Sequence, residues 1–347
     1  MNYGITGTLM KSSILPIGKL PAELLAQMLA RAPILDPRVL EGPGIGMDCA
    51  VIDNGDTCLV FKTDPITFVS DAIGWYVVQI NANDIATAGA EPRWFLCTSL
   101  LPEGKTTPEL VQHISDQIYQ ACREKNIAFV GGHTEITHGI DRPILVGMLV
   151  GEVARQRLVT PRGAAPGDAV LLTKGIPIEA TAILAREFPQ RLQGILSEEE
   201  IAEAADYLYK PGISVVRDAR LAQQAGRVTA MHDPTEGGLA ASLWEVAEAS
   251  GRRLVIDPSA IPIPSLSARI CRVFDLNPLA TIASGALLMT VDARDAEAIC
   301  RALQSEGIDC RQIGRVEDGE FGAWTETNGV QTPLLRPQRD DIGKVYE

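Results

Sequence analysis

Four short segments place acidic, amide or histidine side chains beside glycines, a combination found where proteins bind metal ions and phosphates. In the first segment, Gly44-Ile45-Gly46-Met47-Asp48 precedes an apolar run, and Asp64 follows the next apolar run. A hairpin of these two runs would bring Asp48 and Asp64 to one end of a sheet. Because Mg²⁺ prefers oxygen ligands, usually one or two carboxylates plus substrate phosphates, the pair is a candidate metal site. Asp beside Gly or Pro is also ordinary in turns, so a purely structural interpretation stays open.

The second segment, Asn81-Ala82-Asn83-Asp84, lies inside a predicted helix that ends at Gly89 and otherwise buries apolar residues. Asn and Asp are unfavourable in the middle of a helix, because their side chains compete for backbone hydrogen bonds. A polar cluster at such a position suggests that Asn83 and Asp84 face a ligand or a metal. The alternative is a helix face that is simply solvated.

The third segment leads from a predicted buried strand, residues 127–130, into Gly131-Gly132-His133-Thr134-Glu135. A glycine pair lets backbone N–H groups approach an anion without a Cβ in the way, so we expect a phosphate-binding loop here. His133 is a candidate metal ligand or proton carrier. As a lone histidine it is most simply explained as a hydrogen-bonded turn residue.

The fourth segment, His232 to Leu239, joins a predicted strand to a helix. Thr235 is expected to cap that helix, and Gly237 and Gly238 would leave its first amides accessible to a phosphate at the positive end of the helix dipole. Asp233 would then face the metal. Asp-Pro with a capping Thr also makes a helix start without any ligand, but such a cap does not need two glycines in its first turn.

Several common enzyme signatures are missing from the sequence. Neither the P-loop pattern Gly-x-x-x-x-Gly-Lys-Ser/Thr nor a Gly-x-Gly-x-x-Gly after a strand occurs, and Gly-x-Ser-x-Gly is missing as well. The common nucleotide-binding folds and covalent hydrolase chemistry therefore have no motif to support them.

The overall composition is that of a globular protein. The chain has 347 residues, of which 46% are hydrophobic and 22% charged, and this length favours two domains. The net charge of −13 disfavours binding to nucleic acids and anionic membranes. The seven cysteines form no zinc or disulfide pattern, the start lacks the order of a signal peptide, and no apolar run of about 18 residues occurs. We therefore expect a soluble cytoplasmic protein without nucleic-acid or membrane partners.

Strand and helix patterns occur on both sides of a turn-rich stretch at residues 160–168, so we place a boundary near residue 158. The expected domains are residues 1–157 and 158–347, each of the α+β class. In the first we expect strands at 49–53, 57–63, 93–100, 127–130 and 143–153 and helices that span 20–31, end at 88 and span 107–124. In the second we expect strands at 169–173, 228–231, 286–291, 308–316 and near Trp324 and helices at 179–187, 197–208, 214–225, 238–250 and 293–306.

Six motifs together resemble one superfamily, the aminoimidazole ribonucleotide synthetase-like, or PurM-like, group. They are Gly44–Ile52, Thr63–Pro65, Asn83–Pro92, Gly131–Glu135, Pro166–Asp168 and Asp233–Gly238, which stand in the order typical of that group. Its members include the purine enzyme, thiamine-monophosphate kinase, selenophosphate synthetase and HypE, and the motifs look most like those of HypE-like proteins. The resemblance covers nearly the whole chain.

The resemblance implies a two-domain PurM-like ATP-binding fold of the α+β class. The N-terminal sheets of a homodimer would pair into a barrel, the C-terminal domain would be an α/β sandwich, and ATP and Mg²⁺ would bind in the cleft joining the domains. By motif, the metal ligands would be Asp48, Asp64, Asp84 and Asp233. The nucleotide-binding residues would be Asn83, Gly131, Gly132, Thr134, Thr235, Gly237 and Gly238. His133 and Glu135 would be the catalytic residues, with Glu135 as a candidate base.

The function that the resemblance implies is Mg²⁺-dependent use of ATP to activate an amide or carbonyl oxygen, or another acceptor, by phosphoryl transfer. The acceptor would be a small molecule or a group carried by a partner. HypE carries its substrate on a C-terminal cysteine, whereas this chain has no cysteine after Cys310, so a self-carried substrate is excluded. Met47 and His133 stand where many relatives have acids. The alternatives are a nucleotide-binding or interaction protein that has lost catalysis, and a small-molecule kinase like thiamine-monophosphate kinase.

Overall fold

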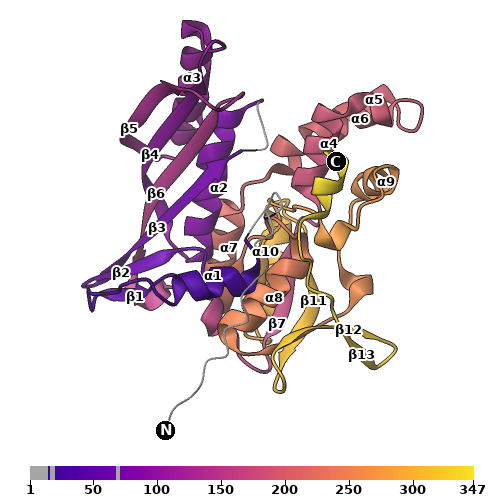
Figure 1. Ribbon diagram of the computed structural model, residues 1–347. Helices are drawn as coiled ribbons and strands as arrows, with labels where there is room; N and C mark the ends of the chain where they lie inside the picture. Colours follow the sequence, from indigo (N-terminus) through magenta and orange to yellow (C-terminus); the bar gives the residue numbers. More distant parts are fainter. Residues whose placement is uncertain (1–14, 16–19, 68–70) are drawn as a thin grey trace, which may run out of the picture.

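The computed structural model describes residue 15 and residues 20–67 and 71–347, which form two sheets with helices packed on them (Figure 1). The first sheet has the strand order β1-β2-β3-β6-β4-β5. Its strands are β1 (Val39–Glu41), β2 (Ala50–Asn54), β3 (Thr57–Ile66), β4 (Glu91–Pro102), β5 (Ala128–Thr137) and β6 (Ile144–Ala154). Neighbouring strands are antiparallel, except that β4 and β5 run parallel.

Two helices, α2 (Ile73–Thr87) and α3 (Pro108–Glu124), pack on one face of this sheet. Helix α2 is buried on nearly every side, because it lies between the sheet and the second half of the chain (Figure 1). Two glycines of strand β6 allow α2 to pack closely against the sheet. A Cβ at Gly147 would lie 2.4 Å from Asn81 Nδ2, and a Cβ at Gly151 would lie 2.2 Å from Ile85 Cγ2.

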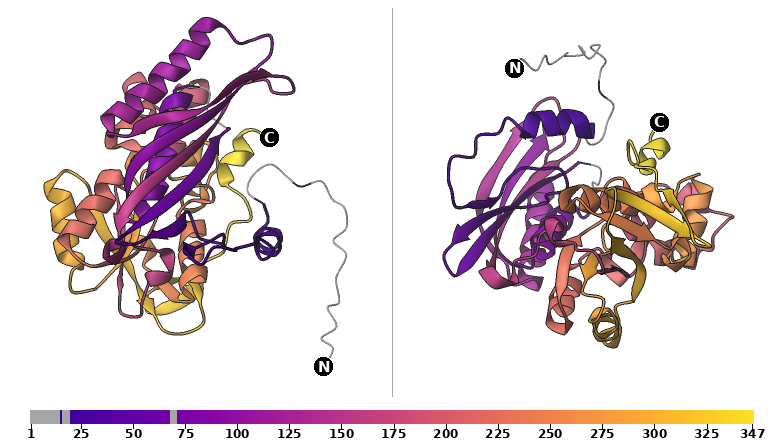
Figure 2. Two further views of the ribbon diagram at one scale, coloured as in Figure 1. Left: turned by 90° about the vertical axis from the view of Figure 1, so that its left-hand side faces the viewer. Right: turned by 90° about the horizontal axis from the view of Figure 1, so that it is seen from below.

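The opposite face of the first sheet, which we call the open face, is exposed and partly apolar. Side chains alternate along each strand, so those between the α2-facing residues point to the open face. Trp94 on β4 and Met148 on β6 are 38% and 40% exposed there. The left panel of Figure 2 views the molecule from this side.

The second sheet has the strand order β13-β12-β9-β11-β7-β10-β8 and lies between two layers of helices. Its strands are β7 (Ala169–Thr173), β8 (Val228–His232), β9 (Arg253–Ile256), β10 (Leu288–Val291), β11 (Cys310–Glu317), β12 (Gly322–Thr327) and β13 (Val330–Pro333). Along β7, Val170 and Leu172 pack with α8 (Gly238–Ser250), whereas Leu171 packs with α7 (Val216–Ala225) and α10 (Ala296–Ser305). The second half is therefore an α/β sandwich.

The two halves meet where α2 packs against α7, and Ala86 of α2 belongs to the same apolar cluster as α7. A group of helices extends the second half beside this seam. They are α4 (Ile178–Glu187), α5 (Pro189–Leu192), α6 (Glu198–Asp206) and α9 (Ser265–Val273). The first described helix is α1 (Ala22–Leu29), and no helix of the described residues is long and apolar enough to cross a membrane.

The predicted strands and helices are present with ends that differ by a few residues, and the α+β class of both halves is confirmed. One local prediction is wrong: Gly131 and Gly132 do not begin a loop, because β5 continues through both glycines to Thr137. The sequence patterns do not predict β1, β9, β13 or α9, which are mostly short. Such short elements form because neighbouring strands and helices complete them.

Candidate active site

Carboxylates from both halves converge at the seam. Asp48 lies in the loop before β2, Asp64 near the end of β3, Asp84 on α2 and Asp233 directly after β8. Burial raises the pKa of Asp84 well above its usual range, and the charges of Asp233, Asp64 and Asp48 raise it further while Lys62 opposes them. The structure thus brings together the four aspartates that the sequence selects as metal ligands.

Lys62 lies between two of these carboxylates. Its Nζ is 3.2 Å from Asp64 Oδ2 and 3.3 Å from Asp84 Oδ2, and its side chain is only 15% exposed. Lys62 and Asp64 are two residues apart on β3, so both side chains point from the sheet toward α2, where Asp84 lies. The sequence motifs do not point to Lys62, although its position two residues before Asp64 was an available signal.

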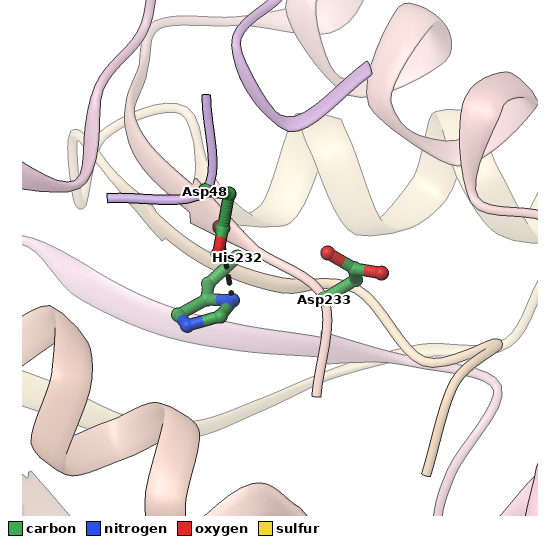
Figure 3. Close-up of side chains that lie close together, drawn as sticks. All are labelled: Asp48, His232 and Asp233. Atoms are coloured by element: carbon green, nitrogen blue, oxygen red, sulfur yellow. Dashed lines mark ion pairs between the residues drawn. The ribbon is translucent and has the colours of Figure 1, made fainter. Parts of the chain in front are cut away.

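His232 is a second cation-forming group in the cluster. It is fully buried at the end of β8, and its Nδ1 lies 3.3 Å from Asp48 Oδ2 (Figure 3). Its Nε2 lies 2.8 Å from Glu245 Oε2 on α8. Burial by itself would lower the pKa of His232, but Asp48 and Glu245 outweigh burial and raise it to about 9. An imidazolium therefore joins the first half of the chain, through Asp48, to the second half. His232 is part of the fourth sequence segment, but the residue pattern indicates no role for it.

Asp233 is the least satisfied side chain of the cluster. It is completely buried, and neither of its carboxylate oxygens has a hydrogen-bond partner. Burial, followed by the charge of Asp48, raises its pKa to about 6. Ligand atoms of Asp48, His232 and Asp233 all lie within 4.8 Å of one another, and Figure 3 shows the three side chains grouped together. A buried carboxylate without partners beside other acids fits a divalent cation, which would supply the missing charge.

Asn83 serves a different purpose in the structure from the one expected. It is completely buried, its Nδ2 donates to the Ile213 carbonyl at 2.7 Å, and its Oδ1 accepts the Val215 N–H at 2.9 Å. Both amide atoms are therefore used to join α2 to the chain just before α7. The neighbouring Asn81 accepts the Asp64 N–H at 3.0 Å and so positions β3 against α2.

The glycine-rich third segment lies away from the buried cluster. Strand β5 is at the edge of the sheet, and β6 and β4 separate it from β3. His133 and Glu135 are exposed and form a hydrogen bond with each other, with 3.1 Å between Nε2 and Oε2. Because they pair with Thr98 and Leu100 of β4, they share the open face with those residues. Within one chain, the structure does not bring Gly131, Gly132, His133, Thr134 or Glu135 to the aspartates.

The start of α8 also differs from the expectation. The helix begins at Gly238 with Gly237 as its N-cap, so the predicted capping role of Thr235 is wrong. The Gly237 N–H donates to Asp340 Oδ2 at 2.6 Å, and the Gly238 N–H donates to the Thr235 carbonyl at 2.9 Å. Both amides thus have partners within the chain, and the carboxylate of Asp340 lies at the helix start where a phosphate is expected.

A second group of buried polar atoms lies beside the aspartates. Glu179 Oε2 on α4 and, on α2, the Tyr76 hydroxyl and Gln79 Oε1 are buried without hydrogen-bond partners. Burial raises the pKa of Glu179 to about 8 and keeps it largely protonated at neutral pH. The charge of Glu236 raises the pKa of both Asp64 and Glu179, so Glu236 lies near both groups. None of these residues is indicated by a sequence motif.

Comparison with known proteins identifies the fold. The family described as AIR synthase related protein, N-terminal domain, matches residues 46–153, and its C-terminal domain matches residues 165–324. A structure of the hydrogenase maturation protein HypE in complex with ATP superposes with a TM-score of 0.69, at 24% identity, covering 90% of this chain and 91% of that one. A structure of ThiL with AMPPCP and TMP gives a TM-score of 0.69 at 22% identity, covering 87% and 92%. The fold is therefore the two-domain fold of AIR synthase related proteins.

Proteins of similar sequence indicate which part of this family the chain belongs to. A hydrogenase expression/formation protein of Methanocaldococcus jannaschii is 29% identical over 341 residues, which cover 94% of this chain and 97% of that protein. Carbamoyl dehydratase HypE of Cupriavidus necator is 31% identical over 275 residues, covering 75% and 74%. The chain belongs to the AIR synthase related family of enzymes, in the part of that family that contains HypE.

Proposed function

We propose that the chain is a Mg²⁺-dependent, ATP-utilising enzyme that activates an amide or carbonyl oxygen of an acceptor by phosphoryl transfer. The observation that carries the proposal is Asp233, whose completely buried carboxylate has no hydrogen-bond partner and lies beside Asp48 at the seam between the halves. Leaving a buried charge unpaired is costly unless a cation completes the site. Relatives of this fold have been solved with ATP and with AMPPCP, which supports ATP as the substrate.

In this proposal, Asp48, Asp84 and Asp233 hold the metal, and bound Mg²⁺ offsets the charges of the carboxylates and the phosphates. The chain's own contribution is positioning. Lys62 places a positive charge against Asp64 and Asp84, and Asn83 ties α2 to the second half, so that acids from both halves stay together. Desolvation of the cluster strengthens these electrostatic interactions, because water no longer screens them.

We place the acceptor beside Glu179. The unpartnered atoms of Tyr76, Gln79 and Glu179 offer hydrogen-bonding positions to a small polar group, next to the aspartates that would hold the nucleotide. With a carboxamide acceptor, transfer of the γ-phosphoryl group to its oxygen, followed by removal of the N–H protons and loss of phosphate, yields a nitrile. The raised pKa of Glu179, about 8, makes its ionised form a stronger base than an ordinary carboxylate, and the fraction of chains in which Glu179 is ionised and can receive such a proton grows as the pH approaches 8. We propose that the acceptor is a small molecule or a group carried by a partner protein.

We further propose that two chains pair through their open faces. The exposed side chains of Trp94 and Met148 would then be covered, and the His133–Glu135 pair would lie at the contact between the chains. In such a homodimer the glycine-rich segment of β5 could complete a site that a single chain leaves open. The role of Glu135 as a base therefore depends on the dimer.

The test is ADP formation with Mg²⁺ and a panel of carboxamide acceptors, on a set of variants each checked for folding by circular dichroism. Asp84→Asn and Asp233→Asn should lose turnover, whereas Asp168→Asn should retain it, because Asp168 is bonded within the second half, to the Ala165 N–H and the Thr229 hydroxyl. Equal rates in all variants would refute the assigned site. Product analysis separates the candidate reactions: a nitrile and inorganic phosphate indicate dehydration, and a phosphorylated acceptor indicates a kinase. ATP binding without turnover would indicate a non-catalytic protein.

A further inference from the structure

Two cysteine thiols lie in contact in the second half of the chain. Cys300 lies on α10 and Cys310 begins β11, and their Sγ atoms are 3.4 Å apart. The last turn of α10 is bonded to the same strand, because Gln304 Nε2 donates to the Cys310 carbonyl at 3.1 Å. Ile299 and Leu303 of α10 also share an apolar cluster with Cys310. The helix and the strand thus hold the two sulfurs against each other.

The two thiols differ in exposure and in acidity. Cys310 is 2% exposed, whereas Cys300 is the one cysteine of the seven, all of which the structure describes, that is not buried. A hydrogen bond from the Cys310 thiol to the thiolate lowers the pKa of Cys300, and the same interaction, together with burial, raises the pKa of Cys310. Cys300 is therefore the thiol that a dissolved oxidant can reach and that ionises first. Because the thiolate is the reactive form of cysteine, Cys300 is the nucleophile of the pair.

The other five cysteines are buried, and burial raises the pKa of each of their thiols. They are Cys49, Cys58, Cys97, Cys122 and Cys271. Cys97 and Cys122 are a useful comparison, because burial and, to a smaller extent, the charge of Cys97 raise the pKa of Cys122 to about 11, and burial raises that of Cys97 to about 11 as well. These two neighbouring thiols lack the exposed and more acidic member that Cys300 supplies.

We propose that Cys300 and Cys310 are a reversible oxidation site that takes a peroxide as its oxidant and forms an intrachain disulfide. The Cys300 thiolate attacks one oxygen of hydrogen peroxide, the O–O bond breaks, and the hydroxide that leaves takes up a proton to form water. The Cys310 sulfur then attacks the sulfenic acid on Cys300. The S–S bond forms, the S–O bond breaks, and the hydroxide leaves with the Cys310 proton as a second water. The two sulfurs lose two electrons, which the peroxide accepts, and a dithiol reverses the reaction by thiol–disulfide exchange.

The present geometry is that of the reduced pair and needs only a local change. An S–S bond is about 2.0 Å long, so the two sulfurs must approach each other by roughly 1.4 Å. We expect rotation about the Cα–Cβ bonds to supply this movement, because Cys300 is only partly buried and can turn toward Cys310. The site uses no residue of the aspartate cluster, so it does not depend on the proposed function.

The experiment maps the disulfide in the full chain. The protein is treated with hydrogen peroxide under native conditions, its remaining thiols are alkylated in denaturant, and its tryptic peptides are analysed by mass spectrometry. Trypsin cleaves after Arg294, Arg301 and Arg311, so Cys300 and Cys310 fall on different peptides, residues 295–301 and 302–311. We expect these two peptides to be linked, dithiothreitol to separate them, and the oxidised protein to migrate as a single chain on a non-reducing gel.

The other five cysteines serve as internal controls, and we expect to recover them alkylated, Cys97 and Cys122 included. The proposal would be overturned if Cys300 were oxidised to the sulfinic acid without forming the linked peptides. It would also be overturned if Cys300 reacted no faster than the buried cysteines, or if the disulfide joined two chains.

Two variants separate the roles of the two thiols. In Cys310→Ala the oxidation should stop at the sulfenic acid of Cys300, which dimedone traps, because the second thiol is missing. In Cys300→Ala the buried Cys310 should stay reduced and be recovered alkylated. Oxidation of Cys310 in that variant as fast as in the wild type would contradict the assignment of Cys300 as the nucleophile. Circular dichroism checks the fold of both variants, and the linked peptides of the wild type decide the proposal if either variant fails to fold.

Discussion

Replacing Asp233 by asparagine should increase the stability of the metal-free protein relative to the wild type, and this gain should grow as the pH rises. Burial and the charge of Asp48 raise the pKa of Asp233 from 3.8 to about 6. At about 1.36 kcal/mol per pKa unit, ionised Asp233 lowers the free energy of unfolding by about 3 kcal/mol at pH 7. Because the pKa is raised in the folded state, this destabilisation is absent at pH values below the unfolded-state pKa of 3.8. It grows between about pH 4 and pH 6, which is the folded-state pKa, and reaches its full size above pH 6.

Asparagine stays neutral, so it removes the part of the penalty that depends on pH. At pH 5 the penalty is roughly half of its value at pH 7, and the stability of Asp233→Asn relative to wild type should therefore improve by about 1–1.5 kcal/mol between these pH values. Urea unfolding at both pH values, with EDTA present, measures this difference. Asp168→Asn is the matched control, because the Asp168 carboxylate accepts hydrogen bonds from the Ala165 N–H and the Thr229 hydroxyl. Loss of the Asp168 carboxylate should lower the free energy of unfolding at both pH values.

Divalent metal should reverse the order of stability. A ligand at 100 times its dissociation constant stabilises the folded state by about 2.7 kcal/mol, and this gain should appear in the wild type and be largely lost in Asp233→Asn. The reasoning would be refuted if Asp233→Asn were destabilised by the same amount at pH 5 and pH 7 and gained as much from Mn²⁺ as the wild type. Asp233 would then be an ordinary buried polar residue.

Three further predictions concern other parts of the structure. Asn83→Ala should lower the free energy of unfolding by about 2–5 kcal/mol, because two buried backbone groups of the second half lose their hydrogen-bond partner. It should also make the seam between the halves accessible to proteolysis. The control is Asn81→Ala, which should destabilise the protein without exposing the seam, because the hydrogen bonds of Asn81 stay within the first half. Because the folded-state pKa of Glu179 is raised to about 8, ionising it should lower wild-type stability by up to about 1.4 kcal/mol per pH unit between about pH 4.5 and 8. Glu179→Gln should remove this decrease, as measured by urea unfolding. An unchanged dependence of stability on pH would contradict the burial argument. Met148→Lys should convert the proposed dimer to monomers in light scattering, because it places a charge on the open face, and an unchanged mass would exclude pairing through that face.

Local sequence patterns predict the regular elements and the residues of the aspartate cluster well. Helix α2, strand β7 and helix α8 follow from apolar periodicity and from glycine or proline at their ends, which act over a few residues. The resemblance to the AIR synthase related family selects the four aspartates as one set. The residues alone indicate Asp48 and Asp64 at one end of a sheet, Asp84 inside a helix and Asp233 at a helix start. These patterns do not show which group each side chain contacts. They therefore predict a ligand for Asn83, whose amide instead bonds Ile213 and Val215, and a capping role for Thr235, although Gly237 is the N-cap.

Residue patterns alone indicate the α+β class, the approximate order of strands and helices, and a set of acids suited to a metal. How those acids are neutralised depends on tertiary packing, because their partners come from strands and helices far apart in the chain. Lys62 meets Asp84 because β3 lies against α2, and His232 meets Asp48 because the two halves pack together. Tertiary packing also places residues 131–135 on an edge strand, because the two glycines continue β5 instead of ending it. Such pairings depend on which elements pack against each other, and no local pattern of residues records that.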